Sequence, residues 1–103
     1  MSQEVTYDFE WDAAKALANA RKHGVTFDQA ATVFLDASTL TVFDAEHSQH
    51  EERRFTLGFD SSGVLLAVAH TFQASTPARM RVRLISARPA TKRERQNHEN
   101  EPR

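Results

Sequence analysis

Arginine recurs at every second position near the end of the chain. On an extended strand Arg79, Arg81 and Arg83 would share one face with Ile85, and the other face would hold Met80, Val82, Leu84, Ser86 and Arg88. Side chains two residues apart on a strand lie about 6.6 Å from one another, near the spacing of phosphates along an extended nucleic-acid strand. Guanidinium groups bind phosphate oxygens in pairs, which ammonium groups cannot do. The pattern therefore indicates a phosphate-binding surface, with charge protection of an edge strand as the alternative.

Groups able to transfer protons occur at two other places. Lys22 and His23 end a predicted helix, where a cation gains about 0.3 to 1 kcal/mol from the helix dipole, so a structural role is the simpler interpretation. His23 can nevertheless exchange protons near neutral pH, as general acid–base chemistry requires. Glu52 is a possible base or arginine partner beside the sheet. Glu51 and Arg53 would share a face if a strand already runs there.

The segment from Asp44 to Arg53 is a possible metal site, because it holds two histidines and four acids. A metal hydrolase would use His47, His50 and Glu51. The segment lacks helical periodicity, however, so a solvated polar loop entering a strand is the favoured interpretation. No metal or other cofactor is therefore expected.

Two further ring side chains are expected to be structural. His70 alternates with Val68 and Phe72 in an apolar strand, which predicts a hydrogen-bonded histidine in the core. Trp11 follows Phe9 closely and is expected in the core or in a subunit contact rather than as a platform for stacking bases.

Composition and charge limit the classes of protein to consider. The chain has 103 residues, 40% of them hydrophobic, with no Cys, which predicts one domain over residues 1–103 and fits a cytosolic address. The sequence shows neither a signal-peptide pattern nor an apolar run of about 18 residues, so neither export nor membrane spanning is expected.

The charges are balanced in total but segregated along the chain. The net charge is −1, so the total gives no reason to expect nucleic-acid binding. Residues 79–95, however, carry seven basic residues against Glu94 alone, a balance of +6, and the rest of the chain must sum to −7. This polarity predicts one surface that attracts anions.

The first third of the chain follows clear local patterns. Residues 5–10 alternate apolar and polar side chains, which predicts a strand suited to a sheet edge. Asp12 is a typical N-cap and Gly24 fits the left-handed position after a helix, so a helix is predicted over Ala13 to His23. A capping-box sequence at Thr26 and Gln29 then opens a second helix. Its apolar stripe consists of Phe27, Ala30, Ala31 and Phe34.

Beyond Asp36 the sequence changes to short β-rich segments. Four strands are predicted at Thr39 to Asp44, Arg53 to Asp60, Val64 to Phe72 and Arg79 to Ala87. Residues 60–63 form a hairpin-sized turn, so the second and third of these strands should pair antiparallel, and the apolar run 64–69 belongs at the centre of the sheet. Residues 73–78 are expected to form a loop that affects access of substrate.

The end of the chain predicts a third helix, opened by a capping box at Thr91 and Glu94 and polar nearly all round, which should fray or need a partner. The last few residues are expected to be disordered. The predicted fold class is therefore α+β: two N-terminal helices packed on a mainly antiparallel sheet of four or five strands, with a C-terminal helix.

Three blocks of sequence, in this order, resemble the BrnT toxins over nearly the whole chain. They are FEWDAAKALANARKHGVTFDQAATVFLD at Phe9 to Asp36, EHSQHEERRFTLGF at Glu46 to Phe59, and RVRLISARPATKRE at Arg81 to Glu94. The resemblance implies the toxin of a bacterial type II toxin–antitoxin pair, a compact cytoplasmic ribonuclease related in fold to the RelE and ParE toxins, which inhibits translation. It also implies a BrnA-type antitoxin that forms a heterotetramer with the toxin. Operator DNA would then be bound only through the antitoxin.

The resemblance also implies which polar residues are functional. The positions that match the family's motifs are Lys22, His23, Glu52, Arg53, Arg83, Ser86, Arg88 and Glu94. Two positions depart from the family pattern. Pro89 stands where a long polar residue is more usual and would stiffen the start of the last helix. His98 stands where many relatives have Tyr, and its imidazole would have to replace that ring in stacking or proton donation.

For this activity we expect RNA to lie across the cationic side of the sheet. Metal-independent cleavage would proceed by attack of the ribose 2′-oxygen on the adjacent phosphorus, giving a 2′,3′-cyclic phosphate. The expected catalytic residues are Arg53, Arg83 and Arg88 opposite the phosphorane charge, Glu52 or His23 as proton acceptor, and Lys22 assisting phosphate binding. Substrate binding is assigned to Arg79, Arg81, Ser86 and Lys92.

This hypothesis requires the guanidinium groups to face water around a concavity, rather than to be scattered or held in internal carboxylate bridges without one. Two other classes stay open. One is a non-catalytic binding module whose exposed sheet and polar helix dock an acidic antitoxin or another protein. The other is the metal hydrolase considered above.

Overall fold

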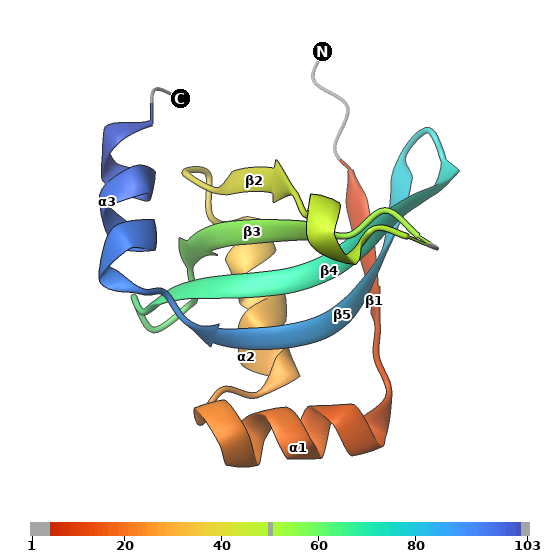
Figure 1. Cartoon of the computed structure of the whole chain (residues 1–103). Helices are drawn as coiled ribbons and strands as arrows, with labels where there is room; N and C mark the ends of the chain where they lie inside the picture. Colours follow the sequence, from red (N-terminus) through yellow and green to blue (C-terminus); the bar gives the residue numbers. More distant parts are fainter. Residues whose placement is uncertain (1–4, 50, 102–103) are drawn as a thin grey trace.

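The computed structural model describes residues 5–49 and 51–101, which form a five-stranded sheet with three α-helices (Figure 1). In chain order the elements are β1 (Thr6–Glu10), α1 (Ala13–His23), α2 (Phe27–Ala31), the 3-10 helix η1 (Thr32–Leu35), β2 (Leu40–Phe43), the 3-10 helix η2 (Ala45–His47), β3 (Arg54–Phe59), β4 (Leu65–Thr76), β5 (Arg79–Pro89) and α3 (Lys92–Asn100). The predicted α+β class is confirmed. The end of the chain expected to be disordered, residues 102 and 103, lies outside the described residues.

The strands are ordered β1-β5-β4-β3-β2 in one mixed sheet. The first strand pairs parallel with β5, and the other neighbours pair antiparallel, so the sheet is mainly antiparallel as predicted. The apolar run in β4 lies at the centre, and the turn at residues 60–63 joins β3 to β4 as an antiparallel hairpin. The strand predicted at residues 5–10 forms one edge of the sheet.

Both N-terminal helices begin where local chemistry predicts, and α1 also ends there, whereas α2 ends at Ala31 and continues as the 3-10 helix η1. The Asp12 side chain accepts a hydrogen bond from the backbone of Lys15, and Gly24 ends α1 in the left-handed conformation with φ 68°. The Thr26 side chain caps α2 by accepting from the backbone of Gln29. The Gln29 side chain does not complete a capping box, because its amide donates to Asp60 in the β3–β4 turn instead.

The core lies between the sheet and the helices α1 and α2. Its buried side chains come from α2, η1 and the link before α2 on one side and from β4 and β5 on the other; they are Val25, Phe27, Ala30, Val33, Leu66, Val68, Val82, Leu84 and Ala87. The opposite face of the sheet carries no helix along most of its length (Figure 1). This helix-free face is therefore the surface on which a site can be built.

A β-bulge in β5 changes which residues reach the helix-free face. The register pairs Leu84 with His70 but Ser86 with Ala69, so Ile85 is an extra residue in β5. Val82 and Leu84 point into the core before the bulge, and Ala87 does so after it. The prediction that Ser86 and Arg88 share a face with Val82 is therefore wrong, because the alternation shifts by one residue and places both on the face of Arg83.

The segment at residues 73–78 is not the predicted loop. Strand β4 continues to Thr76, which is paired with Arg79, and only Pro77 and Ala78 turn the chain. Thr76 has high β-propensity, and pairing with β5 provides hydrogen-bond partners for the backbone of this segment. The β4–β5 hairpin consequently extends as an arm beyond β3, with β1 alongside its β5 strand, at the upper right of Figure 1.

The last helix is held at the end of the sheet that carries the β3–β4 turn (Figure 1). The predicted capping box between Thr91 and Glu94 is present. His98 is buried, donates a hydrogen bond from Nε2 to the carbonyl oxygen of Ser38 at 2.8 Å, and packs edge-on against the ring of Phe59. His98 is therefore the inward-facing anchor of α3. No described helix is both long and apolar enough to cross a membrane.

Candidate active site

The four arginines of β5 that reach the helix-free face each pair with a carboxylate. The pairs are Arg79 with Asp8, Arg81 with Glu10, Arg83 with Glu51, and Arg88 with Glu94. The first two pairs exist because β1 runs parallel to β5 and brings its acidic side chains beside the arginines. The face of β5 predicted to be cationic is thus paired with acids from β1, from the loop before β3 and from α3.

The pairs at the start of β5 are surface ion pairs. Arg79 donates two hydrogen bonds to Asp8, at 3.0 Å from Nε and 2.7 Å from Nη2. These hydrogen bonds are the main cause that lowers the pKa of Asp8 and raises the pKa of Arg79. Arg81 is more loosely paired, with 3.9 Å between its Nε and Oε2 of Glu10. The four side chains are 41–54% exposed, so both arginines remain open to solvent.

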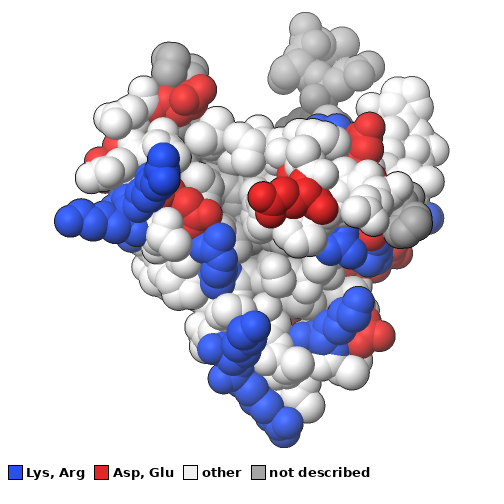
Figure 2. Space-filling view, in the orientation of Figure 1, with Lys and Arg blue, Asp and Glu red and all other residues white. Residues whose placement is uncertain are grey.

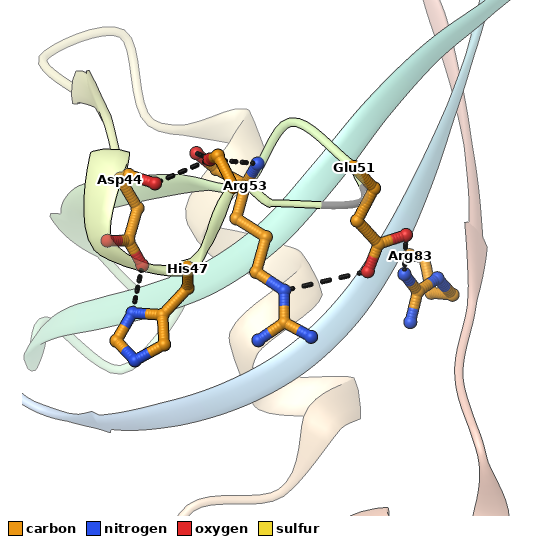
Figure 3. Close-up of polar contacts among 6 residues, drawn as sticks. Asp44, His47, Glu51, Arg53 and Arg83 are labelled. Atoms are coloured by element: carbon orange, nitrogen blue, oxygen red, sulfur yellow. Dashed lines mark hydrogen bonds and ion pairs between the residues drawn. The ribbon is translucent and has the colours of Figure 1, made fainter.

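Arg83 and Arg53 converge on the carboxylate of Glu51 (Figure 3). Nη2 of Arg83 contacts Oε2 of Glu51, and Nε of Arg53 lies 3.5 Å from Oε1. The second contact lacks hydrogen-bond geometry: within the described part of the chain, Arg53 Nε is shielded from solvent and has no hydrogen-bond partner. The contact with Arg83 is the main cause that lowers the pKa of Glu51, and it outweighs the effect of desolvation. Glu51 is thus an ionised carboxylate at neutral pH.

The loop that carries Glu51 is closed by its own hydrogen bonds (Figure 3). The backbone N–H of Asp44 donates to the carbonyl of Arg53 at 2.8 Å, and that of Arg53 donates to Ser48 Oγ at 3.0 Å. His47 Nδ1 lies 2.9 Å from Oδ2 of Asp44. These contacts hold the end of β2 beside the start of β3 and thereby position Glu51 near β5.

Two open cavities flank Glu51. The first, of about 420 Å³, is lined by Glu46, His47, Gln49, Glu51 and Arg53. The second, of about 390 Å³, is lined by Glu10, Glu51, Glu52, Thr71, Phe72, Gln73, Arg81 and Arg83. The concavity that the sequence hypothesis requires is therefore present beside Arg83, and Glu51 contributes to both cavities.

Glu52 faces a different partner from its neighbour Glu51. Its Oε2 accepts a hydrogen bond from Nη2 of Arg54 at 3.0 Å, and the Arg54 guanidinium lies 5.9 Å from the ring centre of Phe72. The Glu52 side chain is 72% exposed and lines the same cavity as Arg83. The structure thus places the predicted proton acceptor at the cavity, while the carboxylate in contact with Arg83 is that of Glu51.

Arg88 is bound to the last helix. Its Nη1 and Nη2 donate to the two carboxylate oxygens of Glu94 at 2.6 and 3.0 Å, and Glu94 also accepts from the backbone N–H of Thr91. The hydrogen bond from Arg88 is the main cause that lowers the pKa of Glu94 to about 2. Ser86 lies on the same strand face and is half-buried. Neither Ser86 nor Arg88 lines the two cavities beside Glu51.

The cations without carboxylate partners lie on helices. Lys22 and His23 end α1, and Lys92 begins α3, so the structure places these predicted residues away from the Glu51 cavities. Among the described residues, the Lys and Arg side chains that form no ion pair are Lys15, Arg21, Lys22, Lys92, Arg93 and Arg95. Figure 2 shows basic side chains over α3 at the left and over α1 at the bottom. The unbalanced positive charge of the fold therefore lies on these two helices.

The described part of the fold does not bring together side chains that could form the metal site considered as an alternative. Within residues 5–49 and 51–101, no group of three or more His, Asp or Glu side chains is placed to hold a metal ion. His47 contacts Asp44 instead, and His50 lies outside the described residues.

His70 and Trp11, for which the sequence predicts structural roles, both pack in or beside the core. His70 is fully buried and its Nε2 lies 2.6 Å from Oγ1 of Thr56, so the prediction of a hydrogen-bonded core histidine is confirmed. Burial is the main cause that lowers the pKa of His70 to about 4. Trp11 packs edge-on against Phe27, with ring centres 5.9 Å apart, beside the core.

Asn19 is a positioning residue that sequence reasoning missed. It is buried in α1, and its amide nitrogen donates to the carbonyls of Val25 and Ala87 at 3.0 and 2.8 Å. Its amide oxygen accepts from the backbone N–H of Ala87 at 3.0 Å. These bonds fix α1 against β5 just after the bulge. The available signal was a lone Asn within an alanine-rich helix.

Comparisons with known proteins agree with the fold. The family described as "Ribonuclease toxin, BrnT, of type II toxin-antitoxin system" matches residues 11–94. The structure is similar to the crystal structure of the Brucella abortus ribonuclease toxin BrnT, with a TM-score of 0.55 and 18% sequence identity; the match covers 88% of this chain and 100% of that chain. The search of curated protein sequences finds no match. The family match includes every arginine of the site, and the chain therefore belongs to the BrnT family of ribonuclease toxins of type II toxin–antitoxin systems.

Proposed function

We propose that this chain is an active endoribonuclease that inhibits translation by cutting RNA in the bacterial cytoplasm. The observation that carries the proposal is the convergence of Arg53 and Arg83 on one carboxylate beside two open cavities. Guanidinium groups that hold a carboxylate are also suited to a phosphate, because both anions present oxygens that accept paired N–H donors. Membership of a ribonuclease toxin family supports RNA as the source of that phosphate.

The residues around the cavity beside Arg83 support specific roles in metal-independent cleavage. Attack of a ribose 2′-oxygen on phosphorus requires a proton acceptor, a proton donor for the leaving 5′-oxygen, and cations opposite the phosphorane charge. Arg53 and Arg83 would supply that positive charge, and water in the open cavity would protonate the leaving 5′-oxygen. Glu52 is the better placed of the two predicted acceptors, because its exposed carboxylate lines the Arg83 cavity, whereas His23 lies at the end of α1. Arg81 lines the same cavity and would bind an adjacent phosphate.

The rest of the RNA backbone would follow the basic side chains of the helices. Lys22 and Lys92 are exposed and belong to the set of cations without carboxylate partners. Arg88 would act indirectly, since its two hydrogen bonds to Glu94 attach α3, and with it Lys92, to the end of β5. Arg79, on the projecting arm and paired with Asp8, would contribute least.

RNA cleavage in the presence of EDTA tests this proposal. Purified protein and end-labelled RNA are incubated with the chelator, and the new ends are examined for 2′,3′-cyclic phosphate. The wild-type protein should cleave, and Arg83→Ala should lower the rate by about 10²- to 10³-fold, the usual effect of losing one electrostatic donor. Arg79→Ala, with the same charge change on the same strand, should lower it by less than about tenfold.

Three results would contradict the proposal: intact RNA, activity abolished by EDTA, or equal effects of the two substitutions. The same proteins added to a cell-free translation reaction should arrest it in proportion to their cleavage rates. Arrest by a protein that leaves the RNA intact would exclude cleavage as the cause.

We also propose a BrnA-type antitoxin as the partner, joined with the toxin in a heterotetramer that binds operator DNA through the antitoxin. Family membership supports an antitoxin of some type. The test is to co-express this chain with a small ribbon-helix-helix protein encoded immediately downstream. The two should co-purify at the mass of a heterotetramer, abolish RNA cleavage and shift operator DNA, which the toxin alone should not shift.

The ion pairs on β5 favour one second candidate, a non-catalytic binding module. An arginine row neutralised by Asp8, Glu10 and Glu51 has less charge to offer to RNA than the sequence predicts. The EDTA assay separates the candidates, because the module would bind the antitoxin and leave RNA intact.

A further inference from the structure

Glu51 occupies the position between Arg53 and Arg83 that an incoming anion would need. Its two carboxylate oxygens face different arginines, Oε2 toward Arg83 and Oε1 toward Arg53 (Figure 3). The three side chains are 32–39% exposed, so solvent reaches the group from the helix-free face. Two guanidinium groups with one internal carboxylate between them form an anion site that is already filled.

The filling is incomplete at Arg53. Its Nε is shielded from solvent and, among the described residues, has no hydrogen-bond partner, although Oε1 of Glu51 lies 3.5 Å away. A shielded N–H without a partner carries a desolvation cost, because it has lost its hydrogen bond to water and gained none in the fold. A phosphate offers more oxygens than a carboxylate, in a tetrahedral arrangement, and can satisfy Arg53 and Arg83 together. The carboxylate of Glu51 therefore satisfies Arg83 more closely than Arg53, and a phosphate has the further oxygens that both arginines need.

Glu51 is also placed so that it can leave. It precedes β3, which begins at Arg54, so no strand pairing holds it. The hydrogen bonds that close its loop are made by Asp44, Ser48 and Arg53 and do not involve the Glu51 side chain. A cavity lies on each side of it, into which the carboxylate can swing.

We propose that Arg53 and Arg83 form a phosphate-binding site that Glu51 occupies in the free protein, so that Glu51 competes with the phosphodiester of a nucleic acid for the two arginines. This inference rests on the proposed function and places a phosphate of its substrate between Arg53 and Arg83. Glu51 then acts as an internal inhibitor, because substrate binding must first break its contacts with the two arginines. Removal of the carboxylate should therefore tighten phosphate binding.

The test measures binding of a single-stranded deoxyoligonucleotide, which lacks the 2′-hydroxyl and cannot be cleaved by 2′-oxygen attack. Fluorescence anisotropy at low salt compares Glu51→Ala with Glu46→Ala. Glu46 lines the first cavity and is exposed but, among the described residues, forms no ion pair with either arginine, so it is a control that removes the same charge without emptying the site. Glu51→Ala should lower the Kd by about tenfold, as expected when a charge-assisted contact no longer has to be broken. Glu46→Ala should lower it by less than about threefold, through general electrostatics alone.

A double variant shows whether the gain acts through the proposed site. Arg83→Ala combined with Glu51→Ala should remove the gain, and inorganic phosphate should compete with the oligonucleotide for Glu51→Ala more strongly than for the wild type. Equal effects of Glu51→Ala and Glu46→Ala, or a gain that survives loss of Arg83, would overturn the inference. Because the probe is not cleaved, these results stand whether or not the protein proves to be a ribonuclease. Thermal unfolding of each variant identifies any that fails to fold.

Discussion

Arg83 and Arg88 show how one residue type serves different purposes on the same strand face. The two side chains are equally exposed, at 34% and 33%, and each pairs with a carboxylate. The partner of Arg83, Glu51, lies on a loop between two cavities. The partner of Arg88, Glu94, belongs to the capping box of α3. Loss of Arg83 should therefore affect ligand binding, whereas loss of Arg88 should affect the attachment of a helix.

Arg88→Ala should lower the free energy of unfolding by about 1–2 kcal/mol, because it removes two charge-assisted hydrogen bonds and leaves a half-buried carboxylate unpaired. Arg83→Ala should change it by less than about 0.5 kcal/mol, because its partner Glu51 is the more exposed carboxylate and lies on a loop, where solvent can replace the arginine. Urea unfolding of both variants checks this. In a double-mutant cycle, Arg88→Ala and Glu94→Gln should be less than additive. Additive effects, or equal effects of the two arginines, would show that Arg88 does not anchor α3.

Residues whose environment is local could be predicted from the sequence, and those with distant partners could not. Asp12, Gly24 and Thr91 act within a few residues of themselves, so helix-capping rules identify them. Asn19 bonds to a residue 68 positions away, and no local rule links the two. Prediction of the site is limited in the same way. The resemblance identified Arg53 and Arg83, but only the fold shows that both contact the carboxylate of Glu51.

At the scale of elements, the bulge in β5 decides which side chains reach the site. Strand alternation predicts faces correctly up to Leu84, and the extra residue Ile85 then reverses the prediction for Ser86 and Arg88. No property of Ile85 in the sequence marks it as the extra residue. Its position follows from the pairing with β4 and from the bonds that Asn19 makes to Ala87.

Asn19→Ala should therefore destabilise the protein by about 2–4 kcal/mol, since it leaves the N–H and C=O of Ala87 without their buried partners. The exposed Asn97→Ala in α3 is the matched control and should cost less than about 0.5 kcal/mol. Chemical denaturation gives both values. Amide hydrogen exchange of Ala87 should accelerate in the Asn19 variant. An unchanged exchange rate would show that α1 does not hold this part of β5.

At the scale of the whole molecule, the segregation of charge along the sequence is partly cancelled by folding. Three acids from outside the basic segment 79–95 pair with its arginines, two from β1 and one from the loop before β3, and Glu94 within the segment pairs with Arg88. A count of charges along a chain cannot anticipate this balance, because it depends on which strands become neighbours. What survives is a positive surface on α1 and α3, so nucleic-acid binding should weaken with salt, although less steeply than seven cations would imply.

Stability of the whole fold should decrease between about pH 6.5 and pH 4, because His70 is buried as a neutral ring. The pKa of His70 falls from its ordinary value of 6.5 to about 4 in the fold. Burial is the main cause, the charge of Arg54 lowers the pKa further, and the hydrogen bond to the carbonyl of Thr71 acts in the opposite direction. The unfolded chain therefore binds a proton in this range that the folded chain does not, so stability is present above pH 6.5 and is lost as the pH falls toward 4.

Urea unfolding should show that the free energy of unfolding falls by about 2 kcal/mol between about pH 7 and pH 5. The full contribution of His70, reached below about pH 4, is about 3 kcal/mol. The carboxylates of Asp60 and Glu94, with pKa values of about 2, add their losses only at lower pH, below their ordinary values of 3.8 and 4.5. His70→Gln should unfold with little dependence on pH above about 5. NMR titration of the wild-type imidazole gives an independent check that needs no variant. A His70 ring that takes up its proton near pH 6.5 in the folded protein would show that burial does not control this transition.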